Sequence, residues 1–219
     1  MSAPPRPAVV FAAAPLRATP RLKSRLAALE DPFVVAADGG ARTALAFGMK
    51  PSAVIGDLDS IDARTLQELQ QQDIALETYP RDKDATDGYL AVQRALQIQP
   101  GRLVLLGYLG GSRLDQALAN VFLLVSLDAP TILLDEHNEC TLLRPGADHV
   151  WRPEPRELVS LLPLGGPADG IQTQGLRWAL RGERLPLGTT RGVSNEPVAA
   201  EARVSIERGL LLVTRHFHE

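Results

Sequence analysis

The sequence has little cysteine, few aromatic residues and no long apolar run, and each absence excludes a class of protein. Of 219 residues, one is cysteine and 5% are aromatic. A single cysteine, Cys140, excludes an intrachain disulfide and a cysteine-based zinc site, and it suits a reducing compartment. No run of about 18 apolar residues occurs, and the start lacks the apolar stretch of a secretory signal. We therefore expect a cytoplasmic protein with no membrane partner.

An excess of basic charge is also missing. The formal net charge is −3, so no electrostatic argument favours nucleic acid or an anionic membrane as partner. With 45% hydrophobic and 22% charged residues, the composition is that of an ordinary globular protein. The length allows one large domain or two small ones.

The first part of the chain alternates short apolar runs with helical patterns, which is typical of βαβ units in a parallel sheet. Most runs are apolar throughout, as expected where helices cover both faces of the sheet and make three layers. Strands are predicted at 8–12, 33–37, 53–55, 74–79, 103–106 and 131–134. Helices are predicted at 21–29, 42–47, 63–71, 86–96 and 114–127. The fold class is therefore α/β for this part.

After about residue 135 the helical periodicity fades, and short apolar stretches alternate with glycine, proline and charged residues, which indicates antiparallel β structure. Apolar side chains occupy every second position in 202–207, and Arg208-Gly209 leads into the apolar run 210–214. This pattern predicts a closing hairpin. We place the domain boundary between residues 138 and 139, giving domains 1–138 and 139–219.

Acidic residues follow three neighbouring strands of the predicted sheet. Asp38 follows the second strand, Asp57 and Asp59 follow the third, and Asp84 and Asp87 come after the fourth. Ligands of open α/β sheets bind at the carboxyl ends of strands. Like charges gathered there favour a bound cation, and oxygen ligands without histidine or cysteine suit Mg²⁺. The alternative is that each aspartate only caps a helix or shapes a loop.

A glycine-rich segment, 107–115, follows the fifth strand. Its glycines would let backbone N–H groups approach a phosphate at a helix N-terminus, where Arg113 would neutralise charge. Alternatively, the glycines only allow a tight turn between the fifth strand and the next helix. Lys83 is one of only three lysines beside 20 arginines, so it is either a phosphate ligand or a solvated surface residue. Trp151 and Trp178 are by default core aromatics.

Six segments, in order, resemble the thiamine diphosphokinase family, also called thiamine pyrophosphokinase. They are Ala37-Asp38-Gly39-Gly40-Ala41, Val54-Ile55-Gly56-Asp57-Leu58-Asp59-Ser60, Lys83-Asp84-Ala85-Thr86-Asp87, Gly110-Gly111-Ser112-Arg113-Leu114-Asp115, Thr173-Gln174-Gly175-Leu176-Arg177-Trp178, and Thr190-Arg191-Gly192-Val193-Ser194-Asn195-Glu196. The resemblance covers the length of the chain. It implies that 1–138 is a catalytic α/β domain that binds ATP and Mg²⁺, and that 139–219 is an all-β sandwich that binds thiamine and mediates dimerisation. The resemblance further implies a homodimer with substrate near the subunit interface.

The resemblance also implies the reaction and its residues. The hydroxyethyl oxygen of thiamine would attack the β-phosphorus of ATP, giving thiamine diphosphate and AMP. Catalysis falls on Asp57, Asp59, Asp87 and Lys83, and Mg²⁺ binding falls on Asp57, Asp59, Asp87 and Asp38. ATP binding falls on Asp38, Gly39, Asp84, Thr86, Gly110, Gly111, Arg113 and Asp115. Thiamine binding falls on Trp178, Ser194 and Asn195, and no general base is assigned.

Three other functions compete with this interpretation. Asp57-Leu58-Asp59 also resembles the nucleophile loop of haloacid-dehalogenase-type phosphatases, but two strands precede it here instead of none. A diphosphokinase for another heterocyclic alcohol, such as a pterin, would keep the chemistry, although Trp178 and Ser194-Asn195 favour thiamine. A non-catalytic nucleotide-binding module is the third, and the intact set of aspartates disfavours it.

Overall fold

The computed structural model describes residues 5–59 and 61–218, and the chain divides into two compact units, residues 1–136 and 137–219. The boundary predicted after residue 138 lies two residues beyond this division. Ser60, the last residue of the segment 54–60 that carries part of the family resemblance, lies outside the described residues. Among the described residues, no helix combines the length and the apolar character that a membrane crossing requires.

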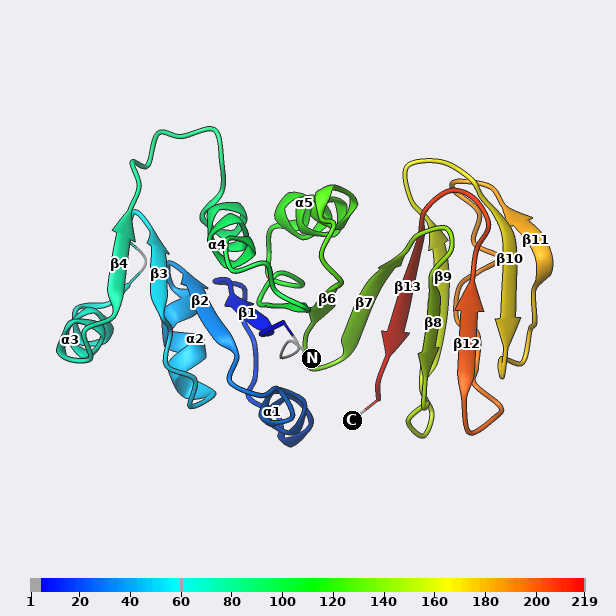
Figure 1. Cartoon of the computed structure of the whole chain (residues 1–219), viewed down its shortest axis with the longest axis horizontal. Helices are drawn as coiled ribbons and strands as arrows, with labels where there is room; N and C mark the ends of the chain where they lie inside the picture. Colours follow the sequence, from blue (N-terminus) through cyan, green and yellow to red (C-terminus); the bar gives the residue numbers. More distant parts are fainter. Residues whose placement is uncertain (1–4, 60, 219) are drawn as a thin grey trace. The chain divides into compact units, whose positions relative to one another are not determined.

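The first unit alternates strands and helices, as predicted (Figure 1). Its strands are β1 (Ala8–Phe11), β2 (Phe33–Ala37), β3 (Ala53–Gly56), β4 (Ala75–Thr78), β5 (Leu103–Leu106) and β6 (Thr131–Leu134). Its helices are α1 (Pro20–Ala27), α2 (Gly40–Ala46), α3 (Ala63–Gln71), α4 (Asp87–Leu96), α5 (Leu114–Leu123) and the short 3₁₀ helix η1 (Leu124–Ser126). The helix predicted over 114–127 is therefore shorter, because its last turn tightens into η1.

All six strands of this unit pair in parallel, in the order β4-β3-β2-β1-β5-β6. The chain adds strands in one direction from β1 to β4 and then returns to place β5 on the other side of β1. The topological switch point therefore lies between β1 and β5, which is where open α/β sheets bind ligands.

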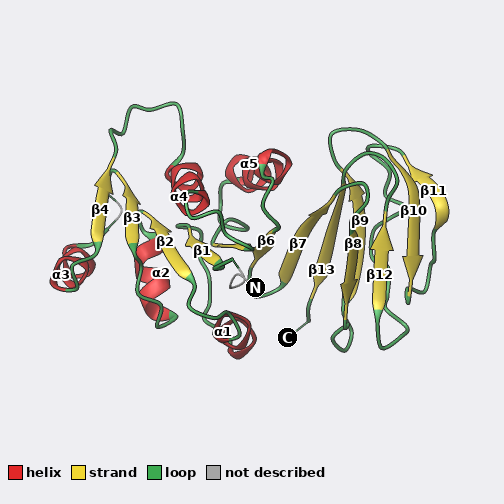
Figure 2. Cartoon of the chain, in the orientation of Figure 1, coloured by secondary structure: helices red, strands yellow, loops and turns green. Residues whose placement is uncertain are grey.

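Helices cover both faces of the parallel sheet (Figure 2). On one face, Leu22 and Leu26 of α1, Ala44 of α2 and Leu69 of α3 join an apolar core with alternate residues of the strands, such as Val9. The other face carries α4, which contacts β1, β2 and β3, and α5 lies on the same side in Figure 1. Strands β1, β2, β3 and β5 are buried at every position, which explains their unbroken apolar runs.

The second unit is built only from antiparallel strands. They are β7 (Asn138–Leu143), β8 (Asp148–Trp151), β9 (Leu158–Pro163), β10 (Ala168–Gln174), β11 (Arg181–Leu185), β12 (Ala202–Ser205) and β13 (Leu211–His216). β13 pairs with β7 and β9, and a second sheet has the order β11-β10-β12-β8. Buried residues of both sheets, among them Val159, Val213, Ile171 and Val204, form one apolar cluster. This is a β-sandwich, as predicted.

The predicted closing hairpin is wrong. β12 pairs with β10 and β8, whereas β13 pairs with β7 and β9, so the two strands belong to different sheets. The connecting residues bind the start of β10 instead: the Glu207 N–H donates to the Asp169 carbonyl (3.0 Å), and the Asp169 N–H donates to the Arg208 carbonyl (2.9 Å). The period-two pattern identified the buried face of β12 correctly, but it carries no information about the partner strand.

Candidate active site

A cleft of about 1060 Å³ lies at the carboxyl ends of the strands in the first unit. Its walls come from the turn after β1, the ends of β2 and β3, the segment 81–89, and the segment from Gly107 into α5. The cleft therefore includes the switch point between β1 and β5. All predicted site residues of this unit line it except Gly39. Gly39 is the N-cap residue of α2.

Carboxylates from two strand ends meet in this cleft. Oxygens of Asp38, Asp57 and Asp59 lie within 4.8 Å of one another. Asp38 is buried, has a φ of 46°, and donates its backbone N–H to the Ile55 carbonyl (2.8 Å), which ties the end of β2 to β3. Because the group contains oxygen ligands only, its donor chemistry fits Mg²⁺ or a similar hard cation.

The backbone of the Asp57 loop stabilises the charged form of its carboxyl group. The Asp59 N–H donates to Asp57 Oδ1 (3.2 Å), and this hydrogen bond lowers the pKa of Asp57 below its ordinary value. The positive charges of Lys83 and Arg81 lower this pKa further. Leu58, between the two aspartates, packs against the core, while Asp57 and Asp59 both face Asp38. The predicted reason for this arrangement, an extended segment, is wrong, because Leu58 has a left-handed φ of 63°.

Asp87 and Lys83 lie beside this group, at the start of α4. Lys83 Nζ is 3.0 Å from Asp87 Oδ1 and also donates to the Pro80 carbonyl (3.0 Å). Thr86 is the N-cap residue, and its hydroxyl accepts from the Tyr89 N–H (3.1 Å). Asp87 is not a member of the group of three carboxylates, so its predicted role as a metal ligand stays a prediction.

Gly56 is a site residue that the sequence analysis missed. Its φ is 152°, and a Cβ atom placed on it would lie 3.1 Å from Asp38 Cβ and 3.3 Å from Asp87 Cγ. The absent side chain thus leaves room for two carboxyl side chains from β2 and α4. A glycine directly before an aspartate at a strand end was the only available signal, and such glycines also occur in ordinary turns.

The predicted phosphate loop joins β5 to α5. Gly110 and Gly111 both have a φ of 76°, a left-handed backbone conformation that favours glycine. Arg113 Nε and Nη2 donate to the two carboxylate oxygens of Asp115 (2.9 and 2.5 Å), with both side chains about two-thirds exposed. This hydrogen bonding lowers the pKa of Asp115 to about 2 and raises the pKa of Arg113. A cation at the cleft surface is thereby held in place beside the glycine loop.

The predicted thiamine residues lie in the second unit. Trp178 is 55% exposed, so the default expectation of a core position is wrong for it, whereas Trp151 is buried. Asn195 is buried, and its side chain holds the Trp178 backbone: Oδ1 accepts from the Trp178 N–H (3.1 Å), and Nδ2 donates to the Trp178 carbonyl (2.8 Å). The Arg177 guanidinium lies 5.7 Å from the Trp178 ring centroid. Ser194 is exposed and has a φ of 61°.

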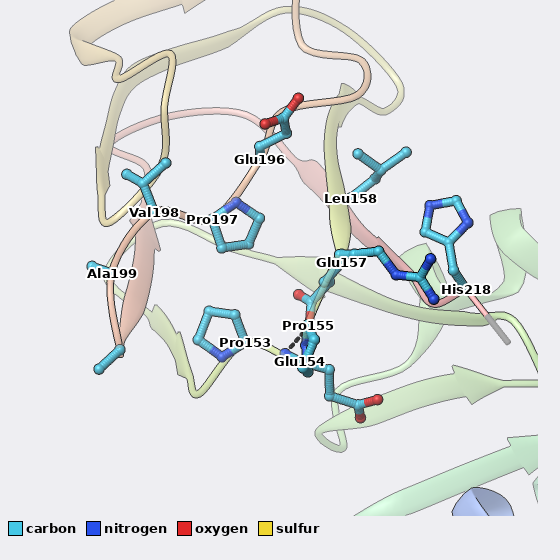
Figure 3. Close-up of a pocket in the computed structure, with 12 residues that line it drawn as sticks. Pro153, Glu154, Pro155, Glu157, Leu158, Glu196, Pro197, Val198, Ala199 and His218 are labelled. Carbon is cyan, nitrogen blue, oxygen red and sulfur yellow. Dashed lines mark hydrogen bonds between the residues drawn. The ribbon is translucent and has the colours of Figure 1, made fainter.

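A second concavity, of about 710 Å³, lies wholly within the second unit (Figure 3). Its lining includes Pro153, Pro197 and Val198 beside charged residues. The dashed line in Figure 3 is the hydrogen bond from the Glu154 N–H to Glu157 Oε2 (2.9 Å). Glu196 forms an ion pair with Arg177 (2.9 Å). None of the predicted site residues lines this concavity.

The family comparisons agree with this geometry. A model described as "Thiamin pyrophosphokinase, catalytic domain" matches residues 26–134, and one described as "Thiamin pyrophosphokinase, vitamin B1 binding domain" matches residues 149–211. The first match contains the acidic cleft residues, and the second contains Trp178, Ser194 and Asn195. Together the two models cover most of the chain, one in each unit.

Several proteins of known sequence or structure match this chain over most of their own length. A thiamine pyrophosphokinase of Bacillus subtilis is 29% identical over 184 residues, which is 83% of this chain and 86% of that protein. A crystal structure of thiamine pyrophosphokinase from B. subtilis covers 98% of this chain and 100% of its own, at 25% identity and a TM-score of 0.87. A crystal structure of thiamin pyrophosphokinase from Geobacillus thermodenitrificans covers 97% of this chain and 98% of its own, at 28% identity and a TM-score of 0.83. The chain belongs to the thiamin pyrophosphokinase family, with its catalytic domain followed by its vitamin B1 binding domain.

Proposed function

We propose that this chain, as a thiamine pyrophosphokinase, performs diphosphate transfer in the acidic cleft of its first unit. The hydroxyethyl oxygen of thiamine forms a bond to the β-phosphorus of ATP, and the bond from that phosphorus to the oxygen of AMP breaks. The hydroxyl proton is released, and the products are thiamine diphosphate and AMP. The observation that carries the proposal is the group of three carboxylates, Asp38, Asp57 and Asp59, within the matched catalytic domain.

These carboxylates would hold Mg²⁺, with Asp87 beside them. When bound, Mg²⁺ neutralises charge on the phosphate oxygens of ATP, which is the main requirement of phosphoryl-type transfer. Asp57 is prepared for this role because the Asp59 N–H keeps its carboxyl group ionised. Gly56 supports the proposal because the space it leaves brings Asp38 and Asp87 together.

Lys83 and Arg113 would bind the phosphates from two sides of the cleft. Each forms an ion pair with a carboxylate, Lys83 with Asp87 and Arg113 with Asp115, and the Lys83 side chain is the less exposed of the two cations. The left-handed backbone at Gly110 and Gly111 exposes main-chain N–H groups to an anion. Asp84 and Thr86 complete the cleft wall, whereas Gly39 would act only indirectly, as the N-cap residue of α2.

Trp178 would bind the thiamine pyrimidine by stacking, since an exposed aromatic ring offers a flat apolar face. Asn195 would act by fixing the Trp178 backbone, because its amide is already used in the two hydrogen bonds to that residue. Ser194 is the exposed polar group of the same segment and would contact the ring edge.

The proposal includes a homodimer. Leu114, Leu118 and Phe122 of α5 are 72%, 47% and 55% exposed, and their spacing of four residues places them on one helix face. A large exposed apolar face of this kind marks an interaction surface, and a second copy of the chain would cover it. This face belongs to the first unit, whereas the resemblance assigns dimerisation to the sandwich. Sedimentation tests this: a mass twice the 23.6 kDa of the chain is expected. The cytoplasmic location stays a prediction from the sequence.

The direct test incubates the purified chain with ATP and Mg²⁺, with and without thiamine, and identifies both products by chromatography. Equal amounts of AMP and thiamine diphosphate, formed only with thiamine, are expected. ADP with thiamine monophosphate would contradict attack on the β-phosphorus. AMP formation with a pterin alcohol but not with thiamine would identify the alternative diphosphokinase, and no transfer to either alcohol would indicate a binding module.

A further inference from the structure

Tyr108 is the most deeply buried polar aromatic residue of the cleft wall, and nothing in the proposed chemistry uses it. Its side chain is 1% exposed although the residue directly follows Gly107 at the end of β5. Burial raises the pKa of its hydroxyl above the ordinary value, so the phenol stays neutral and is available as a hydrogen-bond donor. A buried hydroxyl requires a partner, and the identity of the partner is informative.

The Tyr108 hydroxyl donates to the carbonyl oxygen of Gly88 (2.7 Å). Gly88 is the second residue of α4, immediately after Asp87. The contact is close on the ring side as well, because a Cβ atom on Gly88 would lie 3.3 Å from Tyr108 Cε1. The tyrosine thus fixes the first turn of α4 by a hydrogen bond and by packing, next to the residue that carries the Asp87 carboxylate.

The main chain of Tyr108 makes a second connection, to α5. Asn120 Nδ2 donates to the Tyr108 carbonyl oxygen (2.8 Å). α5 begins at Leu114, directly after Arg113, and carries Asp115 in its first turn. One residue therefore ties the helix that bears Asp87 to the helix that follows the glycine loop. In the chain, α4 comes directly before β5 and α5 directly after it. Tyr108, just beyond the end of β5, therefore contacts the helix on each side of this strand in the sequence.

We propose that Tyr108 is a positioning residue that sets the distance between Asp87, which lies beside the acidic group, and the phosphate loop. This inference rests on the proposed diphosphate transfer. A metal that the aspartates would hold and phosphates that the glycine loop would hold have to be aligned with each other, because misplacement by about 1 Å can reduce a rate about a hundredfold. The hydroxyl of Tyr108 acts on that alignment through Gly88 and Asp87, without touching substrate.

The test is Tyr108→Phe, which removes the hydroxyl and keeps the ring. We expect kcat to fall about tenfold and the Mg²⁺ concentration for half-maximal activity to rise about tenfold, in the range observed for residues that orient metal ligands. KM for thiamine should change less than twofold. Mn²⁺ affinity in the presence of ATP, measured by electron paramagnetic resonance, should fall by the same factor as the Mg²⁺ response.

Tyr79→Phe is the matched control, because Tyr79 is 37% exposed and does not line the cleft. It should leave all four quantities unchanged. Asn120→Ala, which removes the other connection, should raise KM for ATP and provides a second variant should Tyr108→Phe fold poorly. A Tyr108→Phe enzyme with a lower melting temperature but wild-type kcat and Mn²⁺ affinity would overturn the proposal. Absence of thiamine-dependent AMP in the wild type would instead refute the proposed function, and the Mn²⁺ comparison would still test Tyr108.

Discussion

In the first unit, Asp38, Asp57 and Asp59 bring carboxylates of like charge to within 4.8 Å at the edge of a parallel sheet. In the second unit, Arg215 lies between two carboxylates inside a sandwich. Its guanidinium donates to both oxygens of Glu157 (2.8 and 2.9 Å) and to Glu139 (2.9 Å), and the three side chains are at most 7% exposed. Trp151 Nε1 also donates to Glu157 (2.8 Å).

The difference teaches how to distinguish a structural charge cluster from a functional one. Opposite charges that satisfy one another inside a core need no ligand, so the Arg215 network serves the fold. Like charges gathered at strand ends repel, so their arrangement favours a function that brings a cation. We therefore expect carboxylates to have a different role in each unit, and mutations should separate the two roles.

The largest effect is expected on stability, from Arg215→Met. This change leaves Glu139 and Glu157 buried without their cation, and it should lower the free energy of unfolding by about 3–5 kcal/mol. Both tryptophans lie in the second unit, so urea unfolding followed by tryptophan fluorescence reports on that unit. Arg184→Met is the control: its pair with Asp169 (3.5 Å) has a 62% exposed arginine, and the loss should be below about 1 kcal/mol. Equal losses of unfolding free energy in both variants would show that the buried Arg215 network stabilises the fold no more than an exposed ion pair does.

Asp57→Asn and Asp59→Asn should have the opposite effect, a loss of activity without a loss of stability. Each change removes a charge from the acidic group, and kcat should fall roughly 10²- to 10³-fold, because a bound metal contributes several kcal/mol of charge stabilisation. Asp87→Asn should also lose activity. Melting temperatures should stay near that of the wild type. Asp128→Asn, at an exposed position outside the cleft, should keep full activity. Near-normal turnover in all three cleft variants would refute the metal assignment.

Gly56→Ala tests whether the space beside Asp38 and Asp87 in the first unit is needed for activity. Its φ of 152° makes alanine strained, and the added Cβ would press on Asp38 and Asp87. We expect a loss of stability of about 1–3 kcal/mol and a fall in kcat of about tenfold or more. Gly48 also has a positive φ, of 73°, with nothing near its missing side chain. Gly48→Ala should therefore reproduce the loss of stability while kcat stays unchanged; a matching loss of kcat would assign the effect to strain alone.

The smallest effect concerns the pair of Arg113 and Asp115 at low pH. Because the folded-state pKa of Asp115 is about 2, below its ordinary value of 3.8, the pair stabilises the fold fully above pH 3.8. That contribution is lost as the pH falls from 3.8 towards 2, and solvent screening of this exposed pair keeps it small. A carboxyl titration of Asp115 by nuclear magnetic resonance measures the pKa directly. Arg113→Gln should return it towards 3.8, and a pKa unchanged by this substitution would exclude Arg113 as the cause.

The sequence predicted the parallel unit well, because strands buried on both faces appear as unbroken apolar runs. The bounds of β2 and β5 agree with the prediction to the residue. The sequence did not predict the pairing of β12 and β13, because alternation of apolar residues identifies the buried face of a strand and not its partner strand. In the sandwich, the choice between partners depends on contacts such as those of Asp169 with residues 207 and 208, which are distant in the chain.

The candidate site was predictable where the signal was local. The aspartates stand directly after apolar runs, so their position at the strand ends was predictable, and the structure brings Asp38, Asp57 and Asp59 together there. Gly56 and Tyr108 were missed because their importance comes from packing against residues that lie 18 to 31 positions away in sequence, namely Asp38, Asp87 and Gly88. The exposure of Trp178 was not predictable from its residue type, because a large ring usually packs in a core.

The most direct test of the account is the Mn²⁺ affinity of the ATP-bound protein, measured by electron paramagnetic resonance in the wild type, Asp57→Asn and Asp128→Asn. Mn²⁺ prefers the same oxygen ligands as Mg²⁺ and reports its own binding. The account predicts at least a tenfold weaker affinity in Asp57→Asn and an unchanged affinity in Asp128→Asn. Equal affinity in all three proteins would contradict the assignment of the metal to the acidic group.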